Sequence, residues 1–131
     1  MQQRSEPPAA SMASSATVSS RKPASPSTAR LAGRAAVICP AGLADRAVPA
    51  AIAGLYAPHA VICSDAEHAA FVGNCIALSA DTVWMSAAAD AALRDGSRAL
   101  LRDAGFDVRS VPLDAIEAGG GSLRCCIGEI Y

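Results

Sequence analysis

The sequence predicts an α/β fold built from a repeated unit of strands and helices. Short apolar runs that suit buried strands lie at residues 35–39 and 60–63, and segments of helical period separate such runs. The same order of elements occurs twice, and Cys75 in the first half matches Cys125, 50 residues later. A repeat of that length is typical of radially repeated folds, in which no unit buries its core alone.

The first half of the repeat contains two strands and one long helix. The strands are expected at 35–39 (AAVIC) and 60–63 (AVIC), on either side of a helix from about Asp45 to Tyr56. A short helical turn, DAEHAAF, follows the second strand. Because no strand-like run precedes the first strand, this half is expected to lack an opening strand of its own.

The second half adds a hairpin and a closing strand. The runs NCIALS and TVWMS are expected to pair around Ala80-Asp81. A helix from about Ala88 to Ala104 follows, and Gly105 suits its C-cap. The sequence then predicts, in order, a strand at 107–111, a short turn at 112–118, three glycines at 119–121 and a strand from Leu123 to Tyr131.

Two units are too few for a complete fold of this kind. Radially repeated folds need at least about three units, and this chain supplies two, offset by 46 residues at Val37 and Val83 and by 50 at Cys75 and Cys125. Either the rest of the fold lies outside this sequence, or the chain assembles with copies of itself.

Residues 1–30 are expected to form a disordered leader, and residues 31–131 the folded part. The leader is dense in Ser, Pro and Ala, contains no run of large apolar residues and shows no helical or strand period. Its basic, acid-poor composition also suits an organellar transit peptide, although no amphipathic pattern supports one. A linker or a misassigned start is the plainer interpretation.

Charge and hydropathy argue against nucleic-acid and membrane partners. The leader carries four basic residues against one acid, whereas residues 31–131 carry seven arginines against eleven acids. A mildly acidic folded part with scattered arginines lacks the basic footprint of a protein that binds nucleic acid. No apolar run approaches the ~20 residues that span a bilayer, and no signal-peptide core follows the basic residues. The sequence therefore predicts a cytoplasmic chain.

The five cysteines are expected to be reduced thiols without a bound metal, because their number is odd and no CxxC spacing occurs. Cys125 and Cys126 follow three glycines, which let the backbone turn sharply and approach a ligand closely. Either thiol is a candidate nucleophile, although burial of both is common for such a pair in an apolar strand. Within a strand the two thiols would face opposite sides, and Arg124 would face away from Cys125.

A cysteine nucleophile needs a base, and the two histidines are poor candidates for that role. His59 precedes a strand beside Pro58, and His68 lies in the DAEHAAF turn. Each is expected to be a surface or helix-end histidine. Neither stands at metal-ligand spacing from a cysteine.

The run from Asn74 to Ile130 resembles a known enzyme family. The strand GNCIAL, the hairpin into TVWMS and the segment LLRDAGFDVRSVPLDAIEAGGGSLRCCIGEI are similar, in order and spacing, to the C-terminal part of dimethylarginine dimethylaminohydrolase and its relatives in the arginine deiminase and amidinotransferase superfamily. The resemblance covers roughly residues 35–131. It implies a five-bladed α/β-propeller (pentein) of ββαβ units, of which this chain holds about two.

The resemblance also implies a chemistry and a site. The family's substrates are guanidine compounds such as arginine derivatives, and no cofactor takes part. A cysteine thiolate attacks the guanidinium carbon, an amine leaves, and water releases a ureido product such as citrulline from the covalent intermediate. By position, Cys125 is the nucleophile and Cys126 its buried neighbour. The backbone carbonyl near Gly119 resembles one that binds the substrate's α-amino group.

One departure from the family pattern bears on activity. The family's acid–base histidine and its guanidinium-binding acids belong to earlier blades, and no residue here matches them. A thiolate alone does not deliver the proton that the leaving nitrogen requires, so the chain alone is expected to be inactive. Two alternatives stay open. One is a non-catalytic module that binds a partner, or copies of itself, through edges left by the missing blades. The other is a small thiol protein whose paired cysteines sense oxidants.

Overall fold

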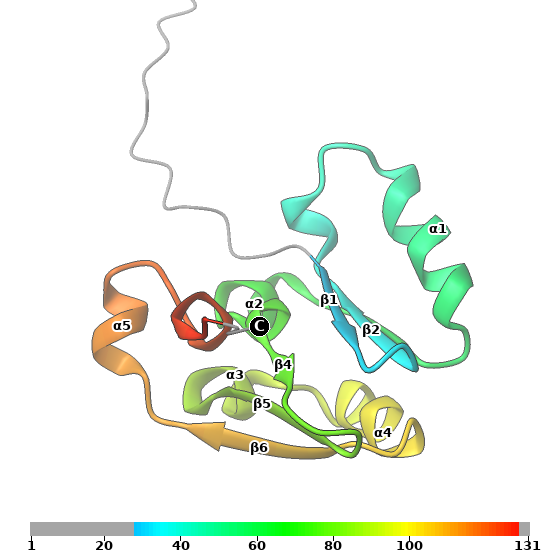
Figure 1. Ribbon diagram of the computed structural model, residues 1–131. Coiled ribbons are helices and arrows are strands. Elements are labelled where there is room, and N and C mark those ends of the chain that lie inside the picture. The colour runs from blue at the N-terminus through cyan, green and yellow to red at the C-terminus, as the bar shows by residue number, and fades with distance from the viewer. Residues whose placement is uncertain (1–27, 129–131) are drawn as a thin grey trace, which may run out of the picture.

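Two three-stranded sheets, one from each half of the sequence, form the framework of the protein (Figure 1). The computed structural model describes residues 28–128. The sheets have the orders β1-β2-β3 and β4-β5-β6, and in each the first two strands are antiparallel and the last two parallel. The predicted repeat is therefore confirmed as two ββαβ units.

The first unit contains one long helix and several short elements. In chain order these are β1 (Thr28–Leu31), β2 (Ala35–Ile38), the 3-10 turn η1 (Pro40–Gly42), α1 (Ala47–Tyr56), β3 (Ala60–Ile62), α2 (Asp65–Ala69) and the 3-10 turn η2 (Val72–Asn74). The helix α1 begins two residues later than expected, because the Asp45 carboxylate accepts a hydrogen bond from Ala47 N–H at 2.8 Å and caps it there.

Strand β1 corrects the expectation that the first half lacks an opening strand. It pairs with β2 through a tight turn in which Ala32 and Gly33 have φ of 47° and 70°. Arg34 N–H donates to the Leu31 carbonyl at 3.0 Å, so these two residues are the centre of the turn, where Ala-Gly is a weaker sequence signal than Asn-Gly. The strand also takes up Thr28–Arg30 of the expected leader, while residues 1–27 lie outside the described part of the chain.

The second unit repeats the first with a broken helix. Its elements are β4 (Ile76–Ala77), β5 (Thr82–Ser86), α3 (Ala87–Ala92), α4 (Asp95–Asp103), β6 (Asp107–Val111), α5 (Asp114–Ala118) and the 3-10 turn η3 (Leu123–Cys126). The single helix expected at 88–104 is wrong, because Leu93 and Arg94 are extended and Arg94 N–H donates to the Glu67 carboxylate at 3.0 Å. Gly105 has φ of 88°, which confirms it as the C-cap glycine.

The expected closing strand from Leu123 is also wrong over the residues that the structure describes. Residues 123–126 form η3, because Cys125 N–H bonds back to the Ser122 carbonyl at 3.1 Å instead of to a neighbouring strand. Residues 129–131 lie outside the described range.

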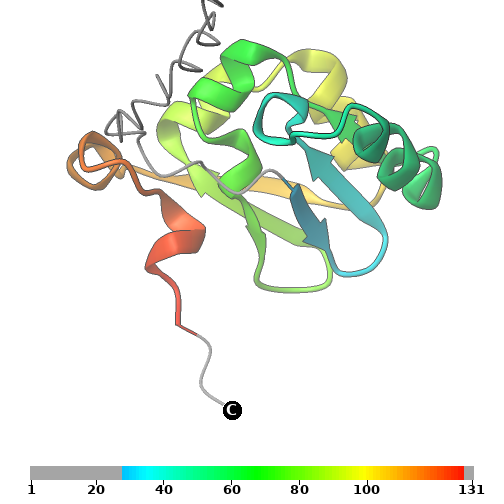
Figure 2. The same cartoon turned by 90° about the horizontal axis from the view of Figure 1, so that it is seen from above.

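Both units contribute to one hydrophobic core. Buried residues of the first unit, such as Leu31 and Val61, belong to the same cluster as Val83, Met85 and Leu101 of the second. The helices α1 and α5 lie at opposite ends of the molecule (Figures 1 and 2). No helix within residues 28–128 combines the length and the apolar character needed to cross a bilayer.

Candidate active site

Asn74 and Cys125 lie at corresponding ends of the two units and are joined by a hydrogen bond. The Asn74 side chain is buried, and its Nδ2 donates to Cys125 Sγ at 3.2 Å. Its Oδ1 accepts from Arg124 N–H at 2.7 Å. One amide thus uses both its ends, to hold the backbone of η3 and to polarise the thiol that η3 carries.

The glycines turn the chain from α5 back toward η3. Gly120 has φ of 94°, a conformation that glycine adopts without strain, and Gly119 N–H donates to the Ile116 carbonyl at 3.0 Å. The turn ends at Ser122, which is buried and donates its hydroxyl hydrogen to Glu117 at 2.7 Å. The structure therefore places the predicted residues Gly119 and Cys125 on one loop, on either side of this turn.

The surroundings of Cys125 favour its thiolate. The hydrogen bond from the Asn74 amide lowers the pKa of the Cys125 thiol most, and a hydrogen bond with the Ser122 backbone and the charge of Arg124 lower it further, against a small opposing effect of burial. Cys125 is exposed, so a reagent in solution reaches this sulfur directly. A lowered pKa and an accessible sulfur are what a thiol needs to attack electrophilic carbon.

Cys126 differs from what the sequence predicts. It was expected as the buried neighbour on the opposite face of a strand, but it is exposed, and its Sγ donates to the Ser122 carbonyl at 3.3 Å. The reason is the 3-10 turn, in which successive side chains do not alternate between two faces. Arg124 was likewise expected to face away from Cys125, yet its charge contributes to the lowered pKa of that thiol. Its guanidinium also donates to the Thr28 carbonyl at 3.0 Å.

The described residues supply no acid–base partner for Cys125. Within residues 28–128 neither histidine forms a hydrogen bond with this thiol, and His68 instead approaches Cys39. The buried carboxylate of Glu67 already accepts hydrogen bonds from Ser64 N–H at 2.8 Å and from Arg94 Nε at 3.0 Å. No group of His, Cys, Asp or Glu in this part of the chain is arranged to hold a metal ion. Within residues 28–128 the Cys125 thiol therefore has Asn74, but no histidine, as a hydrogen-bond partner.

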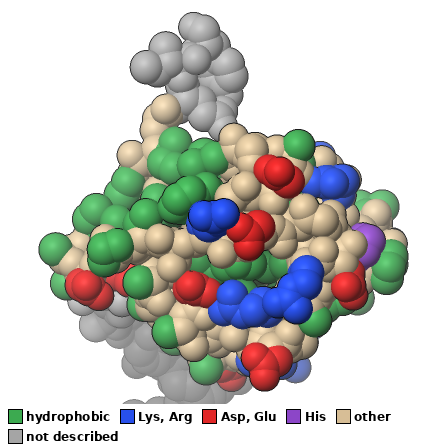
Figure 3. Space-filling view, turned by 90° about the horizontal axis from the view of Figure 1, so that it is seen from below, with side chains coloured by type: hydrophobic (Ala, Val, Ile, Leu, Met, Phe, Trp, Pro, Cys, Tyr) green, Lys and Arg blue, Asp and Glu red, His purple; other side chains and the backbone are tan. Residues whose placement is uncertain are grey.

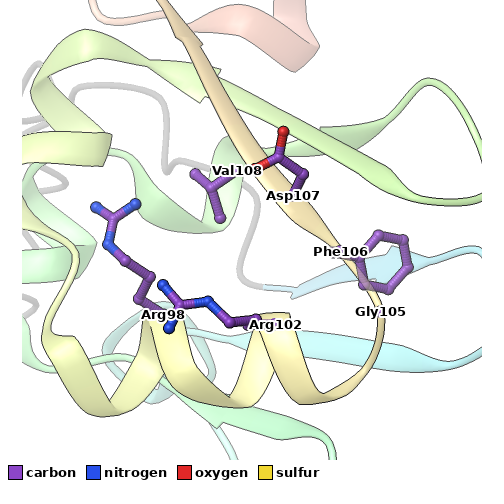
Figure 4. A pocket seen from close by; sticks show the side chains of 6 residues that line it. All are labelled: Arg98, Arg102, Gly105, Phe106, Asp107 and Val108. Carbon is purple, nitrogen blue, oxygen red and sulfur yellow. The ribbon is translucent and has the colours of Figure 1, made fainter.

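A separate pocket of about 370 Å³ lies between α4 and β6 (Figure 4). Arg98 and Arg102 line it from α4, with Phe106 and Val108 at the other side. Arg98 is already paired with Asp90 at 2.6 Å. On the face in Figure 3, acidic side chains lie among the basic ones. This pocket contains none of the cysteines, so it forms no part of the thiol site.

Asn74 is the site residue whose role the sequence interpretation missed. It is the only asparagine in the chain and stands beside Cys75, the repeat counterpart of Cys125. That uniqueness and position were the available signal. The contact itself joins residues 51 positions apart, which spacing along the chain does not reveal.

Comparison with known proteins agrees with the sequence pattern. Residues 29–131 match a protein family described as N,N dimethylarginine dimethylhydrolase, eukaryotic. No curated protein matches the chain.

Solved structures share the fold at low identity. The N-terminal domain of ArgZ, an arginine dihydrolase from the ornithine-ammonia cycle in cyanobacteria, bound to product, is 22% identical with a TM-score of 0.62, over 77% of this chain and 35% of that one. AgrE in a ternary complex with ornithine and NAD+ gives the same identity and TM-score over 77% of this chain and 14% of that one. The present chain thus spans about a third of the ArgZ domain, 35% of its length.

Proposed function

The chain belongs to the eukaryotic N,N-dimethylarginine dimethylhydrolase family, and on that premise we propose that it is the C-terminal portion of a guanidine-modifying hydrolase with Cys125 as its nucleophile. The observation that carries the proposal is the exposed Cys125 thiol with its lowered pKa, held by Asn74. Arginine-type substrates are favoured because proteins that share the fold are ArgZ, an arginine dihydrolase, and AgrE, which binds ornithine.

The proposed reaction begins at the Cys125 sulfur. The thiolate attacks the guanidinium carbon, a C–S bond forms, and the amine leaves once its nitrogen has received a proton, which gives a covalent thiouronium intermediate. Water then attacks the same carbon, the C–S bond breaks, and a ureido compound such as citrulline leaves. The carbonyl near Gly119 is proposed to accept a hydrogen bond from the substrate's α-amino group.

We propose that this chain alone does not turn over. The leaving nitrogen needs a proton donor, and the described residues place no histidine at Cys125. In a five-bladed propeller of which this chain forms two blades, the earlier blades would supply that histidine and the guanidinium-binding acids, either from a longer form of this protein or from a second polypeptide.

A guanidine-like electrophile tests the nucleophile directly. Chloroacetamidine carries an amidinium group beside a reactive carbon, so it should label Cys125 ahead of the other four thiols, as peptide mass spectrometry of the intact chain would show. Iodoacetamide, which has no such group, provides the reference for simple exposure. Equal labelling of Cys125 and Cys126 by both reagents would overturn the proposal, because both thiols are exposed.

A partner-binding module is the second candidate function. Leu55 is 82% exposed and Leu78 is 56% exposed, and the edge strand β4 is only two residues long. Such apolar positions suit contact with missing blades or with a second copy of the chain. Light scattering separates the two cases, because a module that self-associates gives a defined oligomer and a fragment awaiting other blades gives a monomer.

A further inference from the structure

Cys39 and Cys63 lie side by side in the first unit, away from the loop that carries Cys125. Each directly follows a strand, and the parallel register of β2 and β3 pairs Ile38 with Ile62, the residues just before them. Cys63 N–H donates to the Ile38 carbonyl at 2.8 Å, which carries the pairing one residue further. Neighbouring strands run about 4.8 Å apart, which is within the Cα separation that a disulfide requires.

Polar groups surround this thiol pair and stabilise a negative charge on one of its sulfurs. The hydrogen bond from Cys63 lowers the pKa of Cys39 most, burial opposes it, and hydrogen bonds from His68 and the Gly73 backbone help to bring the pKa to about 6. The hydrogen bond to Cys39 and burial raise the pKa of Cys63, and the charge of Glu67 adds to this effect. Of the two thiols, Cys39 is therefore the one that loses its proton first as pH rises.

A second, independent observation at this pair of thiols concerns His68. Its Nδ1 is buried and forms no hydrogen bond within residues 28–128. A buried polar atom without a partner carries a free-energy cost, and it belongs to the imidazole that approaches Cys39. The cluster is not arranged to hold a metal ion in the described part of the chain.

A pocket of about 620 Å³ opens at Cys63, the member of the pair nearer to solvent. Cys63 lines this pocket together with Ser64, Arg94 and Ser97, and it is 7% exposed, whereas Cys39 is fully buried. The pocket volume exceeds that of a peroxide, which on this proposal passes Cys63 to meet the Cys39 sulfur beside it.

We propose that Cys39 and Cys63 form an oxidisable dithiol that closes to a disulfide when it meets a peroxide. The Cys39 thiolate attacks one peroxide oxygen, so that an S–O bond forms, the O–O bond breaks, and the second oxygen leaves as water after taking a proton from the cluster. Cys63, having lost its proton, then attacks the sulfenic sulfur, the S–S bond forms, and the S–O oxygen leaves as a second water. In total the two thiols give up two electrons and two protons, and hydrogen peroxide becomes two waters.

Oxidation of the folded chain by hydrogen peroxide tests this proposal. The Cys125→Ser/Cys126→Ser variant removes the exposed thiols and leaves the pair and Cys75, whose pKa burial raises to about 12. The mass of the variant should fall by about 2 Da, and a peptide in which Cys39 and Cys63 are linked should appear. This disulfide should form at least ten-fold faster than Cys75 is oxidised. Oxidation of Cys75 first, or a linkage found only in denaturant, would overturn the proposal.

Single substitutions, made in the same double-serine background, test the order of the steps. Cys63→Ser should leave Cys39 as a sulfenic acid that dimedone traps, and Cys39→Ser should leave Cys63 unreacted. His68→Gln should slow disulfide formation several-fold, while His59→Gln, at a histidine that does not contact the pair's thiols in the structure, should not change it. Circular dichroism confirms that each variant is folded. The inference does not depend on the hydrolase proposal, since it concerns other thiols than Cys125.

Discussion

Asn74 links the two units at the level of a single side chain. Its amide holds the backbone of Arg124 and the thiol of Cys125 at the same time, through hydrogen bonds of 2.7 and 3.2 Å. An amide keeps this arrangement at every pH, since it does not titrate. The reactivity of Cys125 in the second unit therefore depends on a residue of the first.

Replacing Asn74 should make Cys125 less reactive. In Asn74→Ala the pKa of the Cys125 thiol is expected to rise, because the largest stabilisation of its thiolate is lost. With one hydrogen bond of ~1 kcal/mol removed, alkylation at neutral pH should slow by about five-fold, and the rate–pH profile should move to higher pH. The measurement is iodoacetamide labelling in a Cys126→Ser background. Ser79→Ala, which removes an exposed hydrogen bond to Asp81, serves as the control. An unchanged profile would contradict the assigned role of Asn74.

The resemblance to the family could place Cys125, but the exposure of Cys126 could not be predicted. That prediction depended on an extended backbone, whose side chains alternate between two faces. The observed 3-10 turn is held by Asn74, whose side chain accepts a hydrogen bond from Arg124 N–H, 50 residues later in the sequence. Local pattern contains no trace of such a contact.

Among the elements, α2 connects the two units through a buried carboxylate. Glu67 closes the capping box with Ser64 and also accepts hydrogen bonds from Arg94, at the break between α3 and α4. This explains why a sequence pattern of one helix over 88–104 becomes two helices. The sequence pattern shows only the spacing of apolar residues, whereas the break at Arg94 is set by its hydrogen bond to Glu67 of α2.

Glu67→Gln should destabilise the protein by about 1–3 kcal/mol, because a buried acceptor of charged and backbone donors is replaced by a neutral amide. The lower part of that range is expected, since the Arg94 side chain is 55% exposed and stays solvated. Urea unfolding provides the measurement. Asp65→Asn, on the exposed side of the same helix, should change stability by less than about 0.5 kcal/mol. Equal effects of both substitutions would contradict this account.

Acid should unfold the protein through the carboxylates of Glu67 and Asp90. For Glu67, burial raises the pKa, but hydrogen bonds from Arg94, Ser64 and Ser97 outweigh it and the pKa is lowered. For Asp90, the hydrogen bond from Arg98 is the main cause of a lowered pKa. A lowered folded-state pKa means that the unfolded chain binds protons first, so this stability is present above about pH 4.3 and is lost as pH falls through the folded pKa.

Chemical unfolding as a function of pH checks this expectation. The free energy of unfolding should fall gently from neutral pH to about pH 6, as the Cys39 thiol takes up a proton, and more steeply below about pH 5, as the carboxylates do. The Glu67→Gln/Asp90→Asn variant should be less stable at neutral pH and show a shallower fall. A wild-type stability that rises on acidification would refute the assignment.

At the scale of the whole molecule, the two units behave as one folding unit because they share one core. A substitution in the first unit should therefore be felt in the second. Val61→Ala, at a buried position of β3, should lower stability by about 1–3 kcal/mol. Fluorescence of Trp84, the only tryptophan and a residue of β5, should report that loss as a lower denaturant midpoint.

Leu55→Ala provides the matched control for this experiment. Leu55 belongs to the same unit but is 82% exposed, so its truncation should leave the Trp84 midpoint nearly unchanged. If Val61→Ala also left that midpoint unchanged, the two units would unfold independently.

The repeat, the α/β class and the order of most elements along the chain could be predicted from sequence, because they follow from local apolar pattern and from a motif that occurs twice. The opening strand β1 could not, since four residues and an Ala-Gly turn give a weak signal. The break at Arg94 and the turn at Cys125 could not either, because each depends on a buried polar side chain of the other unit.

The contact between Asn74 and Cys125 also has a direction in time. The amide precedes the thiol by 51 residues, so at 5–20 residues per second the ribosome adds Cys125 about 3–10 s after Asn74. During that interval the Asn74 amide has been synthesised but has no Cys125 sulfur to bond. The pKa of the Cys125 thiol is therefore lowered by Asn74 only after both units have been synthesised and have docked.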